Sequence, residues 1–454
     1  MKFDVGATSR MESIQRWLNP KRLGKSISGS RLFANMSIIT IAMAARLALR
    51  IVIFGIVATS MGAEQFGALA TVSALITFFC SFSGWGADQL LFRRVGRARG
   101  ELPRAMATAL VFLALSAPPL IVLAVVLIPF AIDSSVPWLL VLFISISDIG
   151  LAQVNGIVAG CYQAVGRPMG TLWLTVGFGT VRVVAAVLWI NSASHHDALS
   201  WSYYYLAVSA IAAVVSLWLV PRYLCKPDWK IAWHDWRDGF HFALQTASQT
   251  AFGSTDKPVI AALADLQTAG LYAAATRIVA AAGIPVSALL YSAYVRFFEV
   301  GVSGPRSSAR LAIRLLPFGL ALGAVGAFAI LLLAPLAPRV LGSSYIGTET
   351  ALFILAPLPM VSLIQSLGLD IVISIGRTGL RTLAQLAMPP INILLCWFLV
   401  PSHGATGAAL ASVATRVIIA IAAWAIVAAL LRRETASSSA AIESGKGVQA
   451  PLAE

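Results

Sequence analysis

Twelve long apolar stretches run through this chain, and they restrict its fold more than any other feature. A helix needs about 20 apolar residues to cross ~30 Å of hydrocarbon at 1.5 Å per residue. Only 11% of the residues are charged, against about a quarter in a typical soluble domain. The sequence therefore predicts an all-α membrane protein with twelve transmembrane helices. The stretches cover roughly residues 36–60, 66–87, 105–132, 136–161, 169–191, 202–223, 239–264, 268–292, 311–337, 349–374, 382–401 and 404–431.

The basic residues gather in alternate loops. If the N-terminus is cytoplasmic, 26 of the 33 lysines and arginines lie in cytoplasmic segments and one, Arg339, lies in an outer loop. Such a bias predicts that both termini are cytoplasmic. It also argues against nucleic acid as the partner of a chain with a net charge of +14. We interpret residues 1–33 as a basic cytoplasmic segment, residues 433–454 as a disordered tail, and Arg93 and Arg94 as orientation signals that contact headgroups.

The two halves of the chain resemble each other. Six stretches per half is an even number, so both halves enter the membrane from the same side. We therefore predict two six-helix lobes related by a pseudo-two-fold axis along the membrane normal. The N-lobe covers residues 34–225, the cytoplasmic linker 226–237 and the C-lobe 238–432. The matched motifs are Gly67-Ala-Leu-Ala70 with Gly270-Leu-Tyr-Ala273 and Phe92-Arg93 with Val295-Arg296, both at an offset of 203, and Val165-Gly-Arg167 with Ile375-Gly-Arg377 at an offset of 210.

Several cations lie inside the predicted spans, where each costs ~2.5 to 3.5 kcal/mol on insertion scales. Arg46 and Arg50 are four residues apart on helix one and form a basic stripe. One interpretation is a cationic cleft that holds a phosphate-bearing ligand. The alternative is that these cations pair with acids on neighbouring helices. The other cations proposed for the cleft are Arg182, Lys257, Arg277 and Arg416.

Helix seven carries a polar stripe. It comprises His241, Gln245, Gln249 and Asp256, which fall within about 80° of one another at 100° per residue. By the same count Lys257 points away from the stripe. A buried carboxylate could couple transport to H⁺ or Na⁺, or a nearby Arg or Lys could simply neutralise it. The candidate polar or ion-coupling residues are Gln245, Gln249, Asp256, Asp148 and Asp370.

The chain lacks the sequence patterns of common enzymes. It contains no GxxxxGK[ST], HExxH, GxSxG or CxxC motif. The predicted outer loops are short, whereas a membrane-embedded glycan polymerase or transferase usually carries catalytic residues on a long one. We therefore expect a protein that is not an enzyme and uses no cofactor or metal.

Two segments carry a resemblance to a known family. Met61-Gly-Ala-Glu-Gln-Phe-Gly-Ala-Leu-Ala70, followed by Gly86-Ala-Asp-Gln-Leu-Leu-Phe-Arg-Arg94, resembles the first helical hairpin of Wzx-type polysaccharide transporters. Asp256-Lys and the later Gly270-Leu-Tyr-Ala-Ala-Ala resemble the family's Asp-Lys and Gly-x-Tyr-x-x-Ala signature. In layout the similarity covers about residues 31–432. This family belongs to the multidrug/oligosaccharidyl-lipid/polysaccharide exporter superfamily.

The resemblance implies a flippase for undecaprenyl-diphosphate-linked oligosaccharides in the bacterial inner membrane, working by alternating access in lipopolysaccharide O-antigen or exopolysaccharide biosynthesis. Membrane lipids and polysaccharide assembly proteins would be its partners. Of the residues expected to hold the diphosphate, Lys257 and Arg277 occupy matched motif positions, whereas Arg46 and Arg50 rest on helical geometry. The alternatives are a cation-coupled multidrug exporter of the same superfamily and a membrane-embedded glycan polymerase or transferase. The sugar, the driving force and the oligomeric state stay open.

Overall fold

The computed structural model describes residues 29–132, 136–193, 195–223, 226–233, 235–254, 256–301 and 304–443. Within these residues the backbone forms helices joined by short turns, and no strand. Most of the predicted N-terminal segment, residues 1–28, and the end of the predicted tail, residues 444–454, lie outside them.

The N-terminal half of the chain follows the first six predicted spans. Its elements are α3 (Gly29–Cys80), η1 (Ser83–Gly86), α4 (Ala87–Arg97), η2 (Arg99–Glu101), α5 (Leu102–Ala131), α6 (Trp138–Ser145), η3 (Ile146–Leu151), α7 (Ala152–Ala164), α8 (Pro168–Ser192) and α9 (Ala198–Tyr223). Gly62, at φ 77°, breaks α3 and separates spans one and two.

The C-terminal half follows the other six. Its elements are α10 (Asp235–Ser254), α11 (Asp256–Leu263), α12 (Leu266–Ala282), α13 (Ile284–Gly301), α14 (Pro305–Leu333), η4 (Ala334–Leu336), α15 (Ala337–Leu341), η5 (Ser343–Tyr345), α16 (Thr348–Leu355), α17 (Leu358–Ser374) and α18 (Thr378–Glu443). Gly404, at φ 54°, breaks α18 and separates spans eleven and twelve. The last helix reaches Glu443, well into the segment 433–454 for which the sequence predicted disorder.

The described helices are long and apolar enough for a multi-pass membrane protein. By length and hydropathy, eight of them can cross a membrane, or nine if the bent pair α12–α13 forms one span. Two of the eight, in α3 and α18, run through the breaks at Gly62 and Gly404, so each holds two predicted spans. Span seven falls on α10 and α11, between which residue 255 lies outside the described residues, and it is not among the eight.

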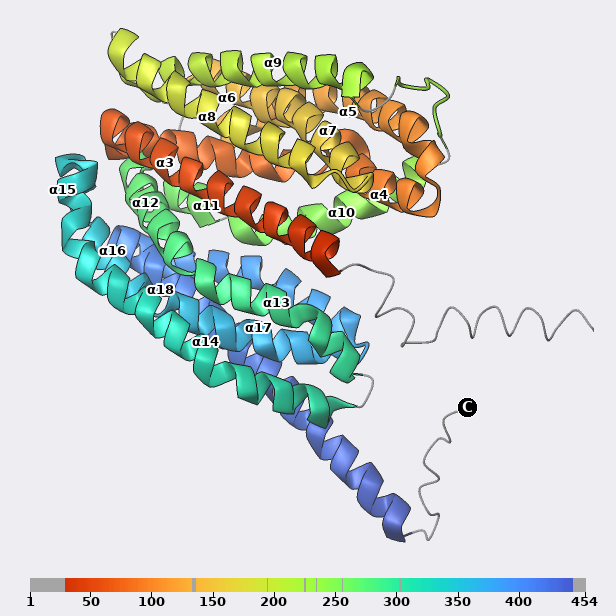
Figure 1. Ribbon diagram of the computed structural model, residues 1–454. Helices are drawn as coiled ribbons and strands as arrows, with labels where there is room; N and C mark the ends of the chain where they lie inside the picture. Colours follow the sequence, from red (N-terminus) through yellow and green to blue (C-terminus); the bar gives the residue numbers. More distant parts are fainter. Residues whose placement is uncertain are drawn as a thin grey trace, which may run out of the picture.

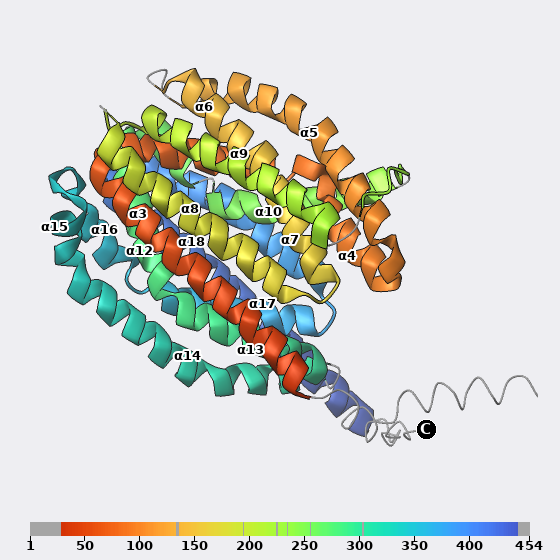
Figure 2. The ribbon, with the colours of Figure 1, turned by 45° about the horizontal axis from the view of Figure 1, so that its top comes forward.

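The helices gather into two groups that follow the two halves of the sequence. Helices α3 to α9 form the N-lobe and α12 to α18 the C-lobe, with α10 and α11 between them (Figure 1). A second view shows α3 beside α12 (Figure 2). The site described below lies along this boundary.

The lobes meet where α3 crosses α12, at the first pair of matched glycines. A Cβ atom on Gly67 would lie 1.8 Å from the carbonyl oxygen of Leu266, and one on Gly270 would lie 1.9 Å from that of Ala63. Leu266 stands 203 residues after Ala63, as Gly270 does after Gly67, so the contact is symmetric. Small residues permit such close helix crossings in membranes. The pseudo-two-fold axis predicted from the sequence therefore passes through this crossing.

The third matched motif forms the same turn in both lobes. Gly166 and Gly376 have φ values of 74° and 79°, the left-handed region that favours glycine. In each lobe the glycine N–H donates to the carbonyl three residues earlier, and the N–H of the next residue, Arg167 or Arg377, donates to the carbonyl five residues earlier. This pattern is a Schellman motif, and it ends α7 and α17 alike.

One end of the boundary between the lobes is closed by a buried cluster, which we call the seal. Tyr345 of η5 is fully buried, and its hydroxyl donates a hydrogen bond of 2.9 Å to the carbonyl of Ala58. The N–H of Ala63 donates to Ser344 Oγ at 3.2 Å. These contacts join the C-lobe to α3. The buried members of the seal are Ala58, Ala63, Phe66, Ala70, Ala273, Ala274, Leu341 and Tyr345.

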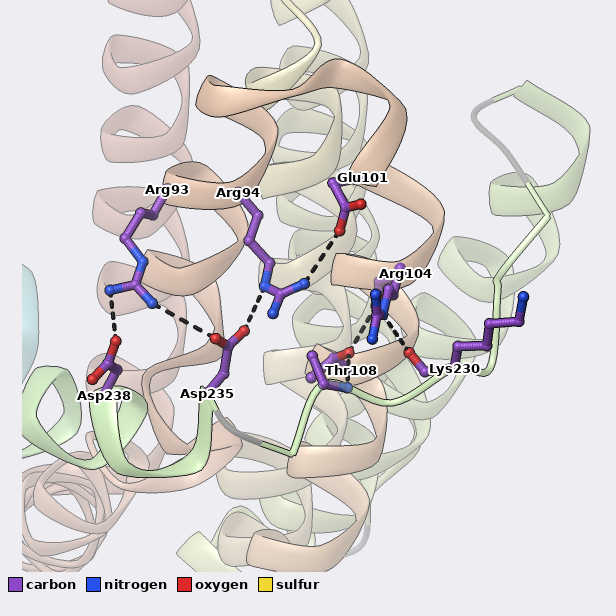
Figure 3. Close-up of polar contacts among 9 residues, drawn as sticks. Arg93, Arg94, Glu101, Arg104, Thr108, Lys230, Asp235 and Asp238 are labelled. Atoms are coloured by element: carbon purple, nitrogen blue, oxygen red, sulfur yellow. Dashed lines mark hydrogen bonds and ion pairs between the residues drawn. The ribbon is translucent and has the colours of Figure 1, made fainter.

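At the opposite end, the segment between the lobes is fastened to the N-lobe (Figure 3). Asp235 is 3% exposed and pairs with Arg94, while Arg93 contacts Asp238 at 2.8 Å. Arg94 also pairs with Glu101 at 3.2 Å. The interpretation of Arg93 and Arg94 as orientation signals and headgroup contacts was therefore incomplete, because the sequence does not show that acids more than a hundred positions later fold against them.

The linker backbone also lies on the N-lobe. Arg104 Nε donates to the carbonyl of Lys230 at 2.8 Å, as Figure 3 shows, and the N–H of Asp228 donates to the carbonyl of Pro103 at 3.2 Å. Trp236 stacks on Trp85 with ring centroids 4.5 Å apart. The start of α10 is thus attached to the N-lobe at this end.

Candidate functional site

Two cavities adjoin along the boundary between the lobes. The N-terminal cavity has a volume of about 450 Å³ and the C-terminal cavity about 570 Å³, within the range usual for ligand sites. Arg277 and Ala280, one turn apart on α12, line both of them. Helix α12 is therefore the wall that the two cavities share.

A tyrosine and a carboxylate face the N-terminal cavity together. Tyr205 of α9 donates to Asp148 Oδ1 at 2.7 Å, and the guanidinium of Arg182 on α8 lies 4.7 Å from the centroid of the Tyr205 ring. Asp148 lies on η3, a π-helical turn, and such turns are frequent at functional sites. Each of the three residues comes from a different helix, so the packing of α8 and α9 on η3 creates this group.

The basic stripe of α3 reaches the same cavity. Arg46 and Arg50 are exposed, and Arg50 lines the N-terminal cavity. Arg46 lies within electrostatic range of Arg50 and Arg182. The structure thus brings together three cations that the sequence placed on two separate helices.

Arg277 marks the junction of the cavities. Its guanidinium lies 4.7 Å from the Phe66 ring centroid and 5.1 Å from that of Phe54, both on α3. Although it is in the middle of a helix, the side chain is exposed. Among the described residues no acid forms an ion pair with Arg277 or Arg50. Arg50 lies within electrostatic range of Asp148 in the same cavity, and none of the ion pairs among the described residues keeps either cation from an anionic ligand.

The C-terminal cavity contains a connected polar group. Lys257 Nζ lies 3.0 Å from Asp256 Oδ1, and the hydroxyl of Tyr272 donates to Asp256 Oδ2 at 2.9 Å. The same hydroxyl lies 2.6 Å from Ser412 Oγ. Arg416 of α18 lines this cavity within electrostatic range of Asp256.

The expected direction of Lys257 was wrong. We predicted that it points away from the polar stripe of helix seven, yet its ammonium contacts Asp256 of that stripe at 3.0 Å and both side chains line the C-terminal cavity. The two residues are consecutive on α11, so their side chains leave the helix about 100° apart, and the long lysine side chain still reaches the carboxylate. Gln245 and Gln249 lie on α10, and their side chains are outside those described.

Asp370 lies apart from both cavities. This buried residue of α17 forms an ion pair with Arg381 of α18 at 3.3 Å. Arg381 also lies 5.7 Å from the Tyr294 ring centroid. The sequence pointed to Asp370 as a candidate for ion coupling but not to Arg381, which neutralises it in the structure.

Apart from Tyr272, which is the tyrosine of the Gly270-Leu-Tyr-Ala-Ala-Ala motif, the other lining residues carried no signal in the sequence. Tyr205 and Tyr272 hold the two cavity carboxylates, and Ser362, Ser366 and Asn392 line the C-terminal cavity. Serines, asparagines and tyrosines occur at many other span positions. Only the packing of the helices distinguishes these residues from the rest.

The fold is that of known membrane transporters. No protein-family model matches the sequence, and no curated protein matches it significantly. Among solved structures, an inward-facing multidrug resistance MATE family transporter of the MOP superfamily matches with a TM-score of 0.67 at 13% identity, over 87% of this chain and 99% of that one. This chain has the MATE fold. The lipid II flippase MurJ in an inward closed conformation matches with a TM-score of 0.66 at 13% identity, over 85% of this chain and 86% of that one.

An outward-facing MATE transporter is also similar, with a TM-score of 0.57 at 14% identity over 88% of this chain and 96% of that one. The predicted fold class, an all-α membrane protein with two six-helix lobes related by a pseudo-two-fold axis, is confirmed.

Proposed function

We propose that this protein is a flippase that moves polyprenyl-diphosphate-linked oligosaccharide across the bacterial inner membrane by alternating access, for O-antigen or exopolysaccharide biosynthesis. The residues expected to surround the diphosphate and sugar are Arg46, Arg50, Arg182, Arg277, Lys257 and Arg416. In this proposal both termini lie in the cytoplasm. The linker of residues 226–237, also cytoplasmic, joins an N-lobe of residues 34–225 to a C-lobe of residues 238–432.

One observation carries the proposal: Arg50 and Arg277, from opposite lobes, line one cavity, and neither forms an ion pair with a described acid, although Asp148 in the same cavity lies within electrostatic range of Arg50. An unpaired charge inside a membrane protein is costly, which favours a role in binding. Guanidinium groups bind phosphate oxygens in a bidentate manner. Lys257 differs, because Asp256 already offsets its charge at 3.0 Å.

Two findings support alternating access. The seal closes the boundary at one end through Tyr345, Ser344 and α3. The structure is also more similar to the inward-facing than to the outward-facing MATE transporter, with TM-scores of 0.67 and 0.57. We therefore assign the seal to the outer side and regard the structure as the inward-facing state. MurJ is a lipid II flippase, so a protein of this fold can act on a lipid-linked substrate.

Reconstituted protein tests the proposal directly. Proteoliposomes receive a fluorescent lipid-linked oligosaccharide, and the rate at which it reaches the opposite leaflet is measured. Loss of one charge-assisted hydrogen bond, worth roughly 1.5 to 3 kcal/mol, should make Arg50→Ala and Arg277→Ala about 10- to 150-fold slower. Arg310→Ala is the matched control, because Arg310 is exposed on α14 and lines neither cavity. Equal rates in all three variants would contradict the assignment of the cleft.

A cation-coupled multidrug exporter is the second candidate. Asp148 and Asp256 line the two cavities, where a carboxylate could take up H⁺ or Na⁺, and MATE transporters share this fold. Deletion of the gene distinguishes the candidates. Loss of surface polysaccharide supports the flippase, whereas intact polysaccharide with new sensitivity to cationic dyes supports the exporter.

A further inference from the structure

The two cavities differ in the chemistry of their walls. Seven serine, threonine or asparagine side chains line the C-terminal cavity together with Tyr272 and its charged residues: Thr276, Ser287, Ser362, Ser366, Asn392, Ser412 and Thr415. The N-terminal cavity has one such residue, Ser73, among mostly apolar neighbours such as Ile53, Phe54 and Leu69. A ligand rich in hydroxyl groups therefore finds many neutral hydrogen-bond partners in the C-terminal cavity, whereas the polar groups of the N-terminal cavity are mainly charged.

Two of these serines have hydroxyls that are free to bind a ligand. A serine within a helix commonly donates to the carbonyl four residues earlier, as Ser60 does to Ile56 at 2.9 Å. Ser362 and Ser366 lie one turn apart on α17 and face the cavity, and within the described part of the chain neither makes a hydrogen bond. A polar group without a partner in this setting is unfavourable unless a ligand or water satisfies it.

The charged group of this cavity supplies complementary donors and acceptors. A sugar hydroxyl both donates and accepts, so it can donate to the carboxylate of Asp256 and accept from the ammonium of Lys257. These two groups are held in place by their mutual contact of 3.0 Å and by the hydrogen bond of Tyr272. The result is a fixed polar wall that carries both signs of charge.

The cavities lie in an order that matches a lipid-linked sugar. Arg277 lines both, so a diphosphate bound there would have the apolar wall on one side and the hydroxyl-lined wall on the other. Polyprenyl-diphosphate sugars have the same order of lipid, anion and hydroxyl-rich sugar. We propose that the C-terminal cavity is a saccharide subsite that binds the sugar nearest the diphosphate, with Ser362 and Ser366 as hydrogen-bonding residues. This inference rests on the proposed function and adds that the two lobes bind different parts of the substrate.

Binding of two probes to the full-length purified protein tests the subsite. The probes are a short-chain polyprenyl diphosphate and the same lipid carrying one N-acetylglucosamine or galactose on its terminal phosphate. Isothermal titration calorimetry compares their affinities. Wild-type protein should bind at least one of the sugar-bearing probes at least about tenfold more tightly than the bare diphosphate. Two hydrogen bonds of ordinary net strength account for a difference of this size.

The double variant Ser362→Ala/Ser366→Ala should lose this advantage. It should bind the sugar-bearing probe no more tightly than the bare diphosphate, while its affinity for the bare diphosphate stays at the wild-type value. Ser292→Ala/Ser402→Ala is the matched control, because both serines are exposed in the C-lobe outside the cavity, and it should keep the full advantage. A melting curve of each variant confirms that it is folded.

The outcomes separate the two proposals. If the bare diphosphate binds and neither sugar adds affinity, or if the double variant weakens both probes equally, the saccharide subsite is wrong and the diphosphate site stands. If wild-type protein binds no probe, the proposed function fails and the subsite fails with it.

Discussion

Replacing Gly67 by alanine should open the seal. The added Cβ would lie 1.8 Å from the carbonyl oxygen of Leu266 and 2.8 Å from the nitrogen of Gly270, where ordinary contacts are 3.4 to 4 Å. Both neighbours are backbone atoms, so no side-chain rotation relieves the clash. Helices α3 and α12 must move apart by at least 1.6 Å along this direction, the difference between 3.4 and 1.8 Å.

The size of the effect follows from two terms. Glycine to alanine in a helix contributes about 1 kcal/mol of helix stability, and for lobes that move apart as rigid bodies this term is equal in the sealed and the open protein. Overpacking costs typically 1 to 3 kcal/mol, and it applies only where α3 and α12 are in contact. The ratio of sealed to open protein should therefore fall by about 5- to 150-fold.

Cysteine accessibility measures this ratio. Ala58 is fully buried in the seal, so in a background without native cysteines Ala58→Cys should react slowly with a water-soluble maleimide. Adding Gly67→Ala should accelerate labelling by the factor above. Gly55→Ala is the matched control on the same helix, because a Cβ there meets nothing within 4 Å. A cysteine at Leu140, fully buried within the N-lobe, reports any general loosening. Labelling of Ala58→Cys at the same rate in both glycine variants would refute the reasoning.

Two further predictions concern the ends of helices. Asp235→Asn should lower the melting temperature of the detergent-purified protein, because the buried carboxylate that pairs with Arg94 is lost at a cost of roughly 1.5 to 3 kcal/mol. The same change at Asp238, whose side chain is 51% exposed, should cost less than about 1 kcal/mol. Equal shifts in melting temperature for the two variants would contradict the role of Asp235 in attaching α10 to the N-lobe. Gly376→Ala should destabilise the folded protein by roughly 1 to 2 kcal/mol, because φ is 79° at this position. Gly379→Ala, within α18 and with open space around it, should stabilise the folded protein slightly. A higher melting temperature for Gly376→Ala than for Gly379→Ala would overturn this prediction.

The sequence predicted the features that depend on composition and repetition. Apolar length indicated the spans because a membrane helix must cover the hydrocarbon, whatever its neighbours are. The matched motifs indicated the symmetry, and the structure shows why their glycines are present: Gly67 and Gly270 allow a close crossing, and Gly166 and Gly376 adopt positive φ. In these cases a single residue type reports a backbone requirement directly.

Features that depend on tertiary contact were not accessible in the same way. Helical geometry could relate Arg46 to Arg50, but nothing in the sequence brings Arg182 and Arg277 to the same cavity. An angular count placed Lys257 away from the polar stripe, but it does not describe how far a long side chain can reach, and Lys257 contacts Asp256. The ion-pair partner of a buried acid, such as Arg381 for Asp370, was hidden because it comes from another helix.

The glycine crossing has the form of an isologous interface, the kind that two identical subunits make on a two-fold axis, where residue i contacts j and j contacts i. Ala63 and Gly67 occupy the positions of Leu266 and Gly270 in the other half. In a homodimer every substitution would be imposed on both subunits at once. In one continuous chain each half can change alone, which frees one cavity to be lined with hydroxyl groups while the other keeps its apolar wall.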